Sequence, residues 1–156
     1  GRYMGVKLWQ RWVKGELLNR GALSSASGHT RQFFGRRNDN SVINAALSHE
    51  PQANTAYSTN LGLGRIWSDE SNRDEHGNLI VQPLHQVHDA VCGQFPIDKT
   101  DWAVKKLKEW MHNEITIAGI PLVIPYEGEY GPSWGDMSVG TIYMDDPQVY
   151  RPPLAD

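Results

Sequence analysis

Two apolar runs that meet at a polar His-Asp pair restrict residues 79–95 to an antiparallel arrangement. The runs, 79–87 and 90–95, are short, apolar and rich in residues that favour strands. We therefore predict a β-hairpin with His88 and Asp89 at its tip. Because Pro83 lacks a backbone donor, a bulge or an edge position is expected in the first strand.

The first 37 residues predict a helix followed by a small hairpin. Apolar side chains recur at helical spacing over residues 4–20, and Gly21 is a suitable residue to end that helix. The apolar positions are Leu8, Trp9, Trp12, Val13 and Leu17. Turn residues and a short apolar run over residues 22–37 indicate the hairpin.

The middle of the chain predicts two helices and a loop. Residues 41–50 have a helical pattern, and Pro51 is expected to kink or restart the helix because its ring excludes one hydrogen bond. A second helix is predicted over 55–67, and the polar, glycine-containing segment 68–78 is predicted to be a loop.

A third helical segment and a last strand follow the predicted tip. Asp98 is expected to cap a helix that runs to about Asn113. Residues 120–124 indicate a strand, and the Gly, Pro and Asp content after Glu127 indicates an extended tail. This order of elements predicts an α+β fold with an antiparallel sheet, in which the hairpin at 79–95 packs on helices.

Charge is distributed unevenly along the chain. Residues 1–37 contain eight basic residues and one acidic residue, whereas the rest contains seven basic and 17 acidic residues. A basic block next to an acidic remainder suits a surface that follows phosphates beside a site that holds metal cations. A solvated basic helix would give the same pattern, so charge leaves both interpretations open.

Composition excludes several classes of protein. No run approaches the roughly 18 apolar residues that a membrane-spanning helix needs, so no membrane partner is expected. Cys92 is the only cysteine, which excludes a disulfide framework and a zinc site built from cysteines. A reducing, cytoplasmic location is expected, which is the bacterial host cytoplasm if a phage encodes the chain.

Asp89 is the candidate metal ligand. Magnesium prefers hard oxygen ligands held on a rigid backbone, and a carboxylate at the tip of an apolar hairpin meets that need. A single His-Asp dipeptide is nevertheless most often an ordinary turn pair. The segments around it change that assessment.

Four segments, in the expected order, resemble the C-terminal part of family A (DNA polymerase I type) DNA polymerases. Gln86-Val-His-Asp89 looks like motif C of that family, usually Gln-Val-His-Asp-Glu. The resemblance covers about residues 3–136 and suggests a divergent bacteriophage member. The other matching segments are Gly28-His-Thr-Arg-Gln-Phe-Phe-Gly-Arg-Arg37, Ala46-Leu-Ser-His-Glu-Pro-Gln-Ala-Asn-Thr-Ala56, and the last helix, strand and Gly131-Pro-Ser-Trp-Gly135.

The resemblance implies a fold and a reaction. Residues 1–37 would follow the fingers, 38–136 would form the part of the palm that carries the motif C hairpin, and 137–156 would be a C-terminal tail. The chain would be part of a nucleotidyltransferase of DNA replication. Its partners would be primer–template DNA, deoxynucleoside triphosphates and the N-terminal remainder of the polymerase.

The resemblance also implies roles for individual residues. Asp89 would be a catalytic carboxylate and a ligand in a site for two Mg²⁺ ions, which lie about 4 Å apart in such enzymes. His88 would lie near the primer end and would belong to the catalytic site. The DNA-binding positions would be Gln86, Gln52, Asn54, Thr55, Arg31 and Arg36.

The chain departs from the family pattern at several positions. Ala90 stands where the family has Glu, His49 stands at an Asn position, Ala45 stands at an Arg position, and Gln52 lies one residue early. Motif A, with the second catalytic Asp, and motif B are expected before Gly1. One carboxylate does not hold two Mg²⁺ ions, so we do not expect this chain to polymerise by itself.

Two alternative functions remain open. One is a catalytically inactive DNA-binding or structural remnant of a polymerase. The replacement of the usual Glu by Ala90 favours this alternative, whereas the retained Asp89 argues against it. The other, a His-Asp metal phosphohydrolase, fits poorly because its ligands lie on helices. Because the chain opens at Gly1 without an initiator Met, we expect a split subunit, a processed product or a trimmed segment of a longer protein.

Overall fold

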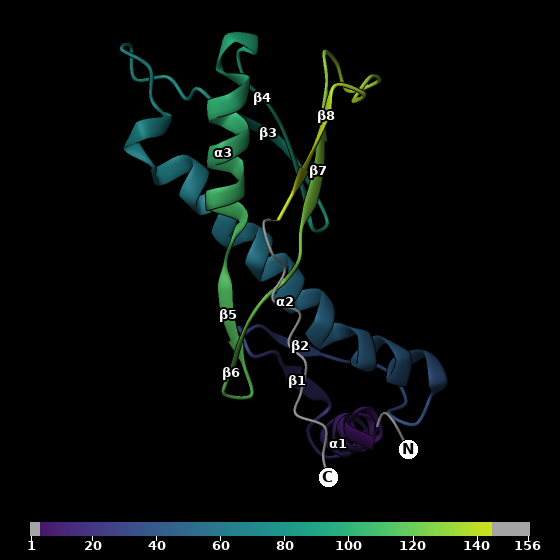
Figure 1. Ribbon diagram of the computed structural model, residues 1–156. Helices are drawn as coiled ribbons and strands as arrows, with labels where there is room; N and C mark the ends of the chain where they lie inside the picture. The colour runs from purple at the N-terminus through teal and green to yellow at the C-terminus, as the bar shows by residue number, and fades with distance from the viewer. Residues whose placement is uncertain (1–3, 145–156) are drawn as a thin grey trace. The chain divides into compact units, whose positions relative to one another are not determined.

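The structure is a computed structural model that describes residues 4–144. It divides into two compact units, Gly1–Tyr57 and Ser58–Asp156, which are described separately. The long helix α2, Asn40–Ser68, contributes to both units (Figure 1). None of the helices within residues 4–144 is long and apolar enough to cross a membrane.

The first unit packs a helix and a short hairpin against the start of α2. Helix α1 spans Met4–Arg20, strand β1 spans Ala22–Ser24 and strand β2 spans Thr30–Gln32. Gly21, with a φ of 67°, ends α1 in the left-handed conformation that favours glycine. The helix, its end and the hairpin were all predicted. The core contains Val13, Leu17, Leu23 and Ala46.

Helix α2 corrects one expectation. Residues 41–50 and 55–67 were predicted as two helical stretches with a kink or a restart at Pro51, and they form one helix with Pro51 inside it. Proline removes only one intrahelical hydrogen bond, and packing on both sides can hold the helix together. Ala46 is fully buried before Pro51, and Ile66 is 1% exposed after it.

Up to residue 144, where the description ends, the second unit has one helix, two 3₁₀ turns and three hairpins after the end of α2. The first hairpin is β3, Gln82–Val87, with β4, Ala90–Gln94, and it precedes helix α3, Thr100–Met111. Ile66, Val81, Ala103 and Trp110 form the core. The remaining elements are η1 Glu70–Asn72, η2 Ile97–Lys99, β5 Glu114–Ile117, β6 Ile120–Val123, β7 Glu127–Tyr130 and β8 Gly140–Tyr143.

The α+β class is confirmed, whereas the single antiparallel sheet is not. In the described part of the chain, the eight strands form four separate two-stranded antiparallel sheets, each made by neighbours in sequence. A hairpin is determined by its own turn and alternation, but joining hairpins into one sheet requires long-range pairing. These strands, which are three to six residues long, pair locally only.

Two further expectations in the second unit are wrong. The segment after Glu127 is not an extended tail up to residue 144, because β7 and β8 pair over Glu127 to Tyr143. Residues 145–156 of the expected tail lie outside the described residues. Asp98 does not cap α3: it lies in η2, and the cap position is Lys99, which makes no side-chain capping hydrogen bond.

Candidate functional site: the tip of the β3–β4 hairpin

His88 and Asp89 form the two-residue turn between β3 and β4, as predicted. Val87 pairs with Ala90, so the two residues between them complete the loop. His88 has a φ of 54°, a left-handed conformation that is uncommon outside glycine. The turn therefore holds the backbone of the His-Asp pair in a specific and sparsely populated geometry.

The ladder below the tip contains the irregularity that Pro83 predicted. Gln86 pairs with Val91 and His85 pairs with Cys92, but the register shifts between Pro83 and His85. A bulge at this place lets proline occupy the strand without breaking the ladder beyond it.

Helix α2 holds the hairpin at two points. The Thr59 hydroxyl donates to the backbone carbonyl of Asp89 at 3.0 Å. On the next residue of the helix, the Asn60 side-chain carbonyl accepts from Gln86 Nε2 at 2.8 Å. Thr59 is 5% exposed, whereas Asn60 and Gln86 are exposed. The tip is therefore tied to the helix through both its backbone and a side chain of β3.

The side chains at the tip face solvent. His88, Asp89 and Ala90 are all exposed, so the Asp89 carboxylate is accessible to a ligand from outside the chain. Ala90 offers only a methyl group where a second carboxylate would stand in motif C. The tip thus supplies one hard oxygen ligand and one imidazole.

Asp89 belongs to no cluster of metal-ligating side chains among the described residues. Within residues 4–144 there is no group of three or more His, Cys, Asp or Glu side chains arranged to hold a metal ion. Asp89 has the chemistry of one magnesium ligand, but a hard cation of this kind needs several oxygen donors. Further oxygen donors would come from a bound ligand, from water or from another polypeptide segment.

Three of the expected DNA-binding residues lie on α2 in the first unit. Gln52 is exposed, Thr55 is partly exposed and donates its hydroxyl to the Pro51 carbonyl at 2.9 Å, and Asn54 is only 3% exposed. In this conformation Gln52 presents its amide to solvent, whereas the Asn54 side chain is enclosed. Within the described part of the chain, the Asn54 Oδ1 atom has no hydrogen-bond partner.

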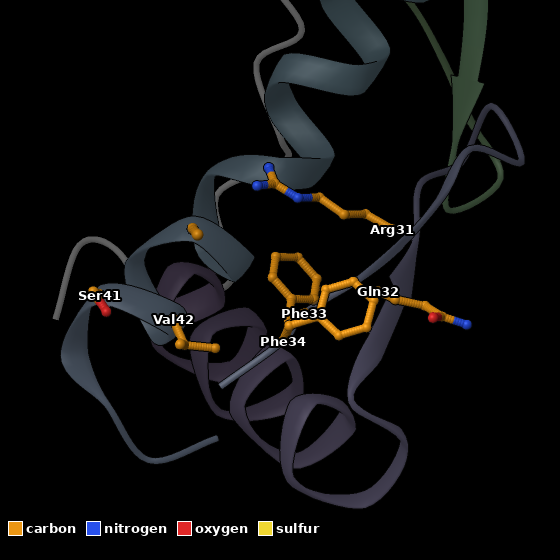
Figure 2. Close-up of a pocket in the computed structure, with 7 residues that line it drawn as sticks. Arg31, Gln32, Phe33, Phe34, Ser41 and Val42 are labelled. Carbon is orange, nitrogen blue, oxygen red and sulfur yellow. The ribbon is translucent and has the colours of Figure 1, made fainter. Parts of the chain in front are cut away.

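Arg31 and Arg36 are exposed in the first unit, as a phosphate-contacting role would require. The Arg31 guanidinium lies 5.1 Å from the centre of the Phe33 ring. Arg31 lines an open hollow of about 270 Å³ together with Phe33 and Phe34 (Figure 2). Phe34 is 86% exposed, so this hollow combines a cation with accessible aromatic surface.

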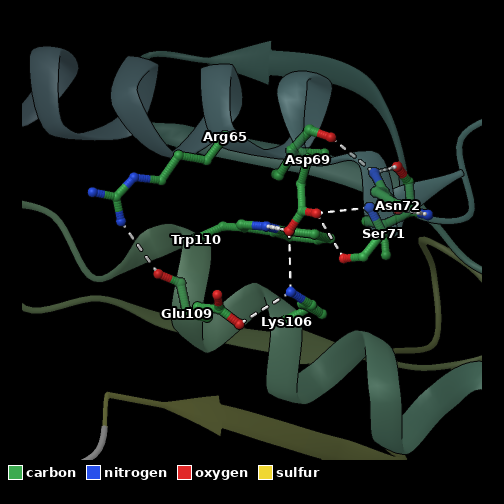
Figure 3. A network of polar contacts seen from close by, with 9 residues as sticks. Arg65, Asp69, Ser71, Asn72, Lys106, Glu109 and Trp110 are labelled. Carbon is green, nitrogen blue, oxygen red and sulfur yellow. Dashed lines mark hydrogen bonds and ion pairs between the residues drawn. The ribbon is translucent and has the colours of Figure 1, made fainter.

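A polar network in the second unit was missed by sequence reasoning. Asp69 accepts four hydrogen bonds and joins the end of α2 to α3 (Figure 3). Its donors are the Ser71 backbone and hydroxyl, at 2.8 and 2.7 Å, Lys106 Nζ at 3.1 Å and Trp110 Nε1 at 2.8 Å. The Ser71 and Trp110 bonds in particular hold the pKa of Asp69 well below its usual range.

Segment 68–78, which was expected to be a loop, is therefore highly organised. Asn72 is fully buried, and its amide group donates to the carbonyls of Ile66 and Val81 at 2.8 and 3.0 Å. The Val81 amide donates back to Asn72 Oδ1 at 2.8 Å. The Asp69-x-Ser71 spacing, typical of a local side-chain turn, was the available sequence signal.

No protein-family model, curated protein or solved structure matches the chain. The resemblance to family A polymerases therefore rests on the motifs quoted above, and its functional content stays a prediction.

Proposed function

We propose that this chain is the C-terminal part of a template-directed DNA polymerase of family A. Asp89 supplies one of the carboxylates that hold Mg²⁺, and the basic first unit contributes to the surface that binds primer–template DNA. The remaining carboxylate and the nucleotide-binding residues belong to the N-terminal part of the polymerase. Magnesium, when bound, would stabilise the attacking and leaving oxygens of nucleotidyl transfer.

The observation that carries this proposal is the exposed Asp89 carboxylate on a backbone that is fixed on both sides. The β3–β4 ladder holds the flanking residues, and Thr59 binds the Asp89 carbonyl. An accessible carboxylate on a restrained backbone suits a metal ligand.

The neighbouring residues have supporting roles in the same proposal. His88 precedes Asp89 in the turn and is exposed, so its imidazole is available to the primer end. Gln86 is exposed on β3 and is bound to Asn60, which places its amide on the face of the hairpin toward α2. In the first unit, Arg31 and Arg36 present guanidinium groups that suit phosphate oxygens.

The second candidate is a catalytically inactive DNA-binding remnant, and Ala90 is the feature that favours it. An alanine at the tip removes the negative charge that would lie beside the metal ligands. In this case the first unit would still bind DNA, but the native assembly would not extend primers.

Primer extension by the native polymerase that contains this segment tests the proposal. The assay uses Mg²⁺ and four deoxynucleoside triphosphates, and it compares the native protein with the Asp89→Asn and Asp98→Asn variants. Asp98 is an exposed carboxylate of the same unit, outside the hairpin, and serves as the matched control. We expect Asp89→Asn to lower the extension rate by about a thousandfold, because a lost metal ligand removes several kcal/mol of transition-state stabilisation.

Each outcome separates the two candidates. Loss of extension in Asp89→Asn alone supports the polymerase. Equal rates in the native protein and Asp89→Asn contradict the catalytic role of Asp89. DNA binding without any extension by the native assembly supports the inactive remnant.

A further inference from the structure

The half of the β3–β4 hairpin nearest its tip is exposed, and two hydrogen bonds tie it to α2. In the described residues, β3 and β4 pair only with each other, and a two-stranded hairpin is marginally stable in water by itself. The register shift between Pro83 and His85 interrupts its ladder, and Leu84 to Ala90 are all exposed. The orientation of the tip must therefore depend on the groups that tie it to the helix.

Two consecutive residues of α2 make these ties. Thr59 binds the backbone of Asp89 itself, at 3.0 Å, and Asn60 binds the side chain of Gln86, at 2.8 Å. The Thr59 bond is the more consequential of the two because Thr59 is 5% exposed, so water competes for it less than for the exposed Asn60–Gln86 pair.

A bond to the Asp89 carbonyl restricts the direction of its carboxylate. The carbonyl and the side chain share one Cα atom, so fixing the peptide plane after Asp89 limits the directions that the side chain can take. His88, with its positive φ, fixes the peptide on the other side of Asp89. The backbone around the carboxylate is thus determined by the turn on one side and by Thr59 on the other.

We propose that Thr59, assisted by Asn60, is a positioning residue for Asp89, which sets the carboxylate in the orientation that metal binding requires. This inference rests on the proposed function, because it assigns a purpose to the orientation of Asp89. It needs no contact between Thr59 and DNA, nucleotide or metal. Helix α2 thereby acts on the chemistry at the tip through one backbone hydrogen bond.

The decisive comparison is Thr59→Val against Thr59→Ser in the native polymerase. Valine keeps the shape of the side chain and removes the donor, whereas serine keeps the donor. Thr100→Val is the matched control, since the Thr100 hydroxyl donates to the Ile97 carbonyl at 2.7 Å in the same unit but away from the hairpin. Asn60→Ala tests the weaker tie.

The first readout is hydrogen exchange of the backbone amides of residues 87–91, measured without metal. We expect Thr59→Val to accelerate this exchange by about three- to tenfold, which corresponds to the loss of one ordinary hydrogen bond. Thr59→Ser and Thr100→Val should exchange like the native protein at these positions. Asn60→Ala should have a smaller effect, of about twofold, because its bond is exposed.

The second readout is single-nucleotide incorporation as a function of Mg²⁺ and DNA concentration. We expect Thr59→Val to lower the maximal rate about tenfold or more and to raise the Mg²⁺ concentration for half-maximal rate, because small misplacements of a reacting group are costly. The DNA concentration for half-maximal rate should change less than the maximal rate does. Thr59→Ser should restore both the rate and the Mg²⁺ requirement.

Each of the two readouts can contradict the positioning role of Thr59 by itself. Native exchange at the tip in Thr59→Val, or a native rate and Mg²⁺ requirement in that variant, overturns the positioning role even if Asp89→Asn abolishes extension. If Thr59→Val exchanges faster but Asp89→Asn keeps full activity, the proposed function is overturned. Thr59 then only stabilises the position of the hairpin. If Thr59→Val does not fold, a Thr59→Ser variant that differs from the native protein in either readout contradicts the proposal.

Discussion

The indole nitrogen of Trp110 donates a hydrogen bond to the Asp69 carboxylate at 2.8 Å and thereby joins α3 to the end of α2. Trp110 is 2% exposed and belongs to the core of the second unit. Asp69 therefore connects the apolar core to the turn from which the chain continues toward the β3–β4 hairpin. The stability of this unit should depend on the charge of one carboxylate.

We expect the stability of the second unit to decrease as the pH falls below about 4, and Asp69→Asn to reduce that dependence. The pKa of Asp69 in the folded protein is lowered, first by Ser71 and then by Trp110, so the folded state binds its proton less readily than the unfolded state. Stabilisation by such a group is complete above its unfolded pKa of about 3.9 and is lost as the pH falls through its folded pKa.

Urea unfolding at a series of pH values between neutral and acid measures this effect. The matched variant is Asp98→Asn, which removes an exposed carboxylate of the same unit. It should keep the acid dependence of the native protein. An equally steep dependence in Asp69→Asn would show that other groups cause it.

Asn72→Ala should destabilise the second unit by about 2–4 kcal/mol, because it leaves buried backbone groups without partners. The side chain is fully buried and bonds to the Ile66 carbonyl and to both backbone polar groups of Val81. Chemical denaturation measures the loss. Asn78→Ala, which removes an exposed side-chain bond to Asp74, is the comparison and should have a much smaller effect.

Local patterns in the sequence were enough to predict most elements. Apolar spacing predicted α1, and the two runs around His88 and Asp89 predicted the β3–β4 hairpin with its turn at the correct residues. These elements are determined by contacts close in sequence. The β7–β8 hairpin was missed because its strands contain glycine and because nine residues, 131–139, separate them.

Features that depend on distant contacts were not accessible from the sequence. The Thr59 bond to Asp89 spans 30 residues and the Trp110 bond to Asp69 spans 41, and no local spacing indicates either partner. The organisation around Asn72 could not be predicted for the same reason. Polar residues in a glycine-containing segment are typical of loops. Only the burial of Asn72 in the folded unit gives its hydrogen bonds a structural role.

Gly93→Ala should strain the hairpin that carries the candidate site. A Cβ atom on Gly93 would lie 2.6 Å from the Gln82 carbonyl oxygen, and this oxygen belongs to the backbone of the paired strand. We expect a loss of about 1–3 kcal/mol in hairpin stability, because backbone atoms cannot rotate away as a side chain can. Faster hydrogen exchange in residues 82–94 would report it.

The matched variant for this change is Gly128→Ala in strand β7. Its new Cβ atom would lie 3.8 Å from the nearest atom, on Ile142, which is an ordinary van der Waals contact. Exchange in the β3–β4 hairpin should stay at the native rate in Gly128→Ala. Native exchange in Gly93→Ala as well would mean that the hairpin adjusts its register without loss.

Under the proposed function, three of the arginines of the first unit, Arg31, Arg36 and Arg37, should separate into two classes in DNA binding. All three side chains are exposed, and Arg37 donates to the Leu18 and Asn19 carbonyls at 2.6 and 3.3 Å, at the end of α1. We expect Arg31→Ala and Arg36→Ala each to reduce the slope of log affinity against log salt by about one, as loss of one phosphate contact does.

Arg37→Ala should instead destabilise the first unit by about 1–2 kcal/mol, because it removes hydrogen bonds to carbonyls at the helix end. Salt titration of primer–template binding and urea unfolding of the native protein distinguish the two classes. Unchanged slopes for both Arg31→Ala and Arg36→Ala would contradict the proposed assignment of this surface to DNA.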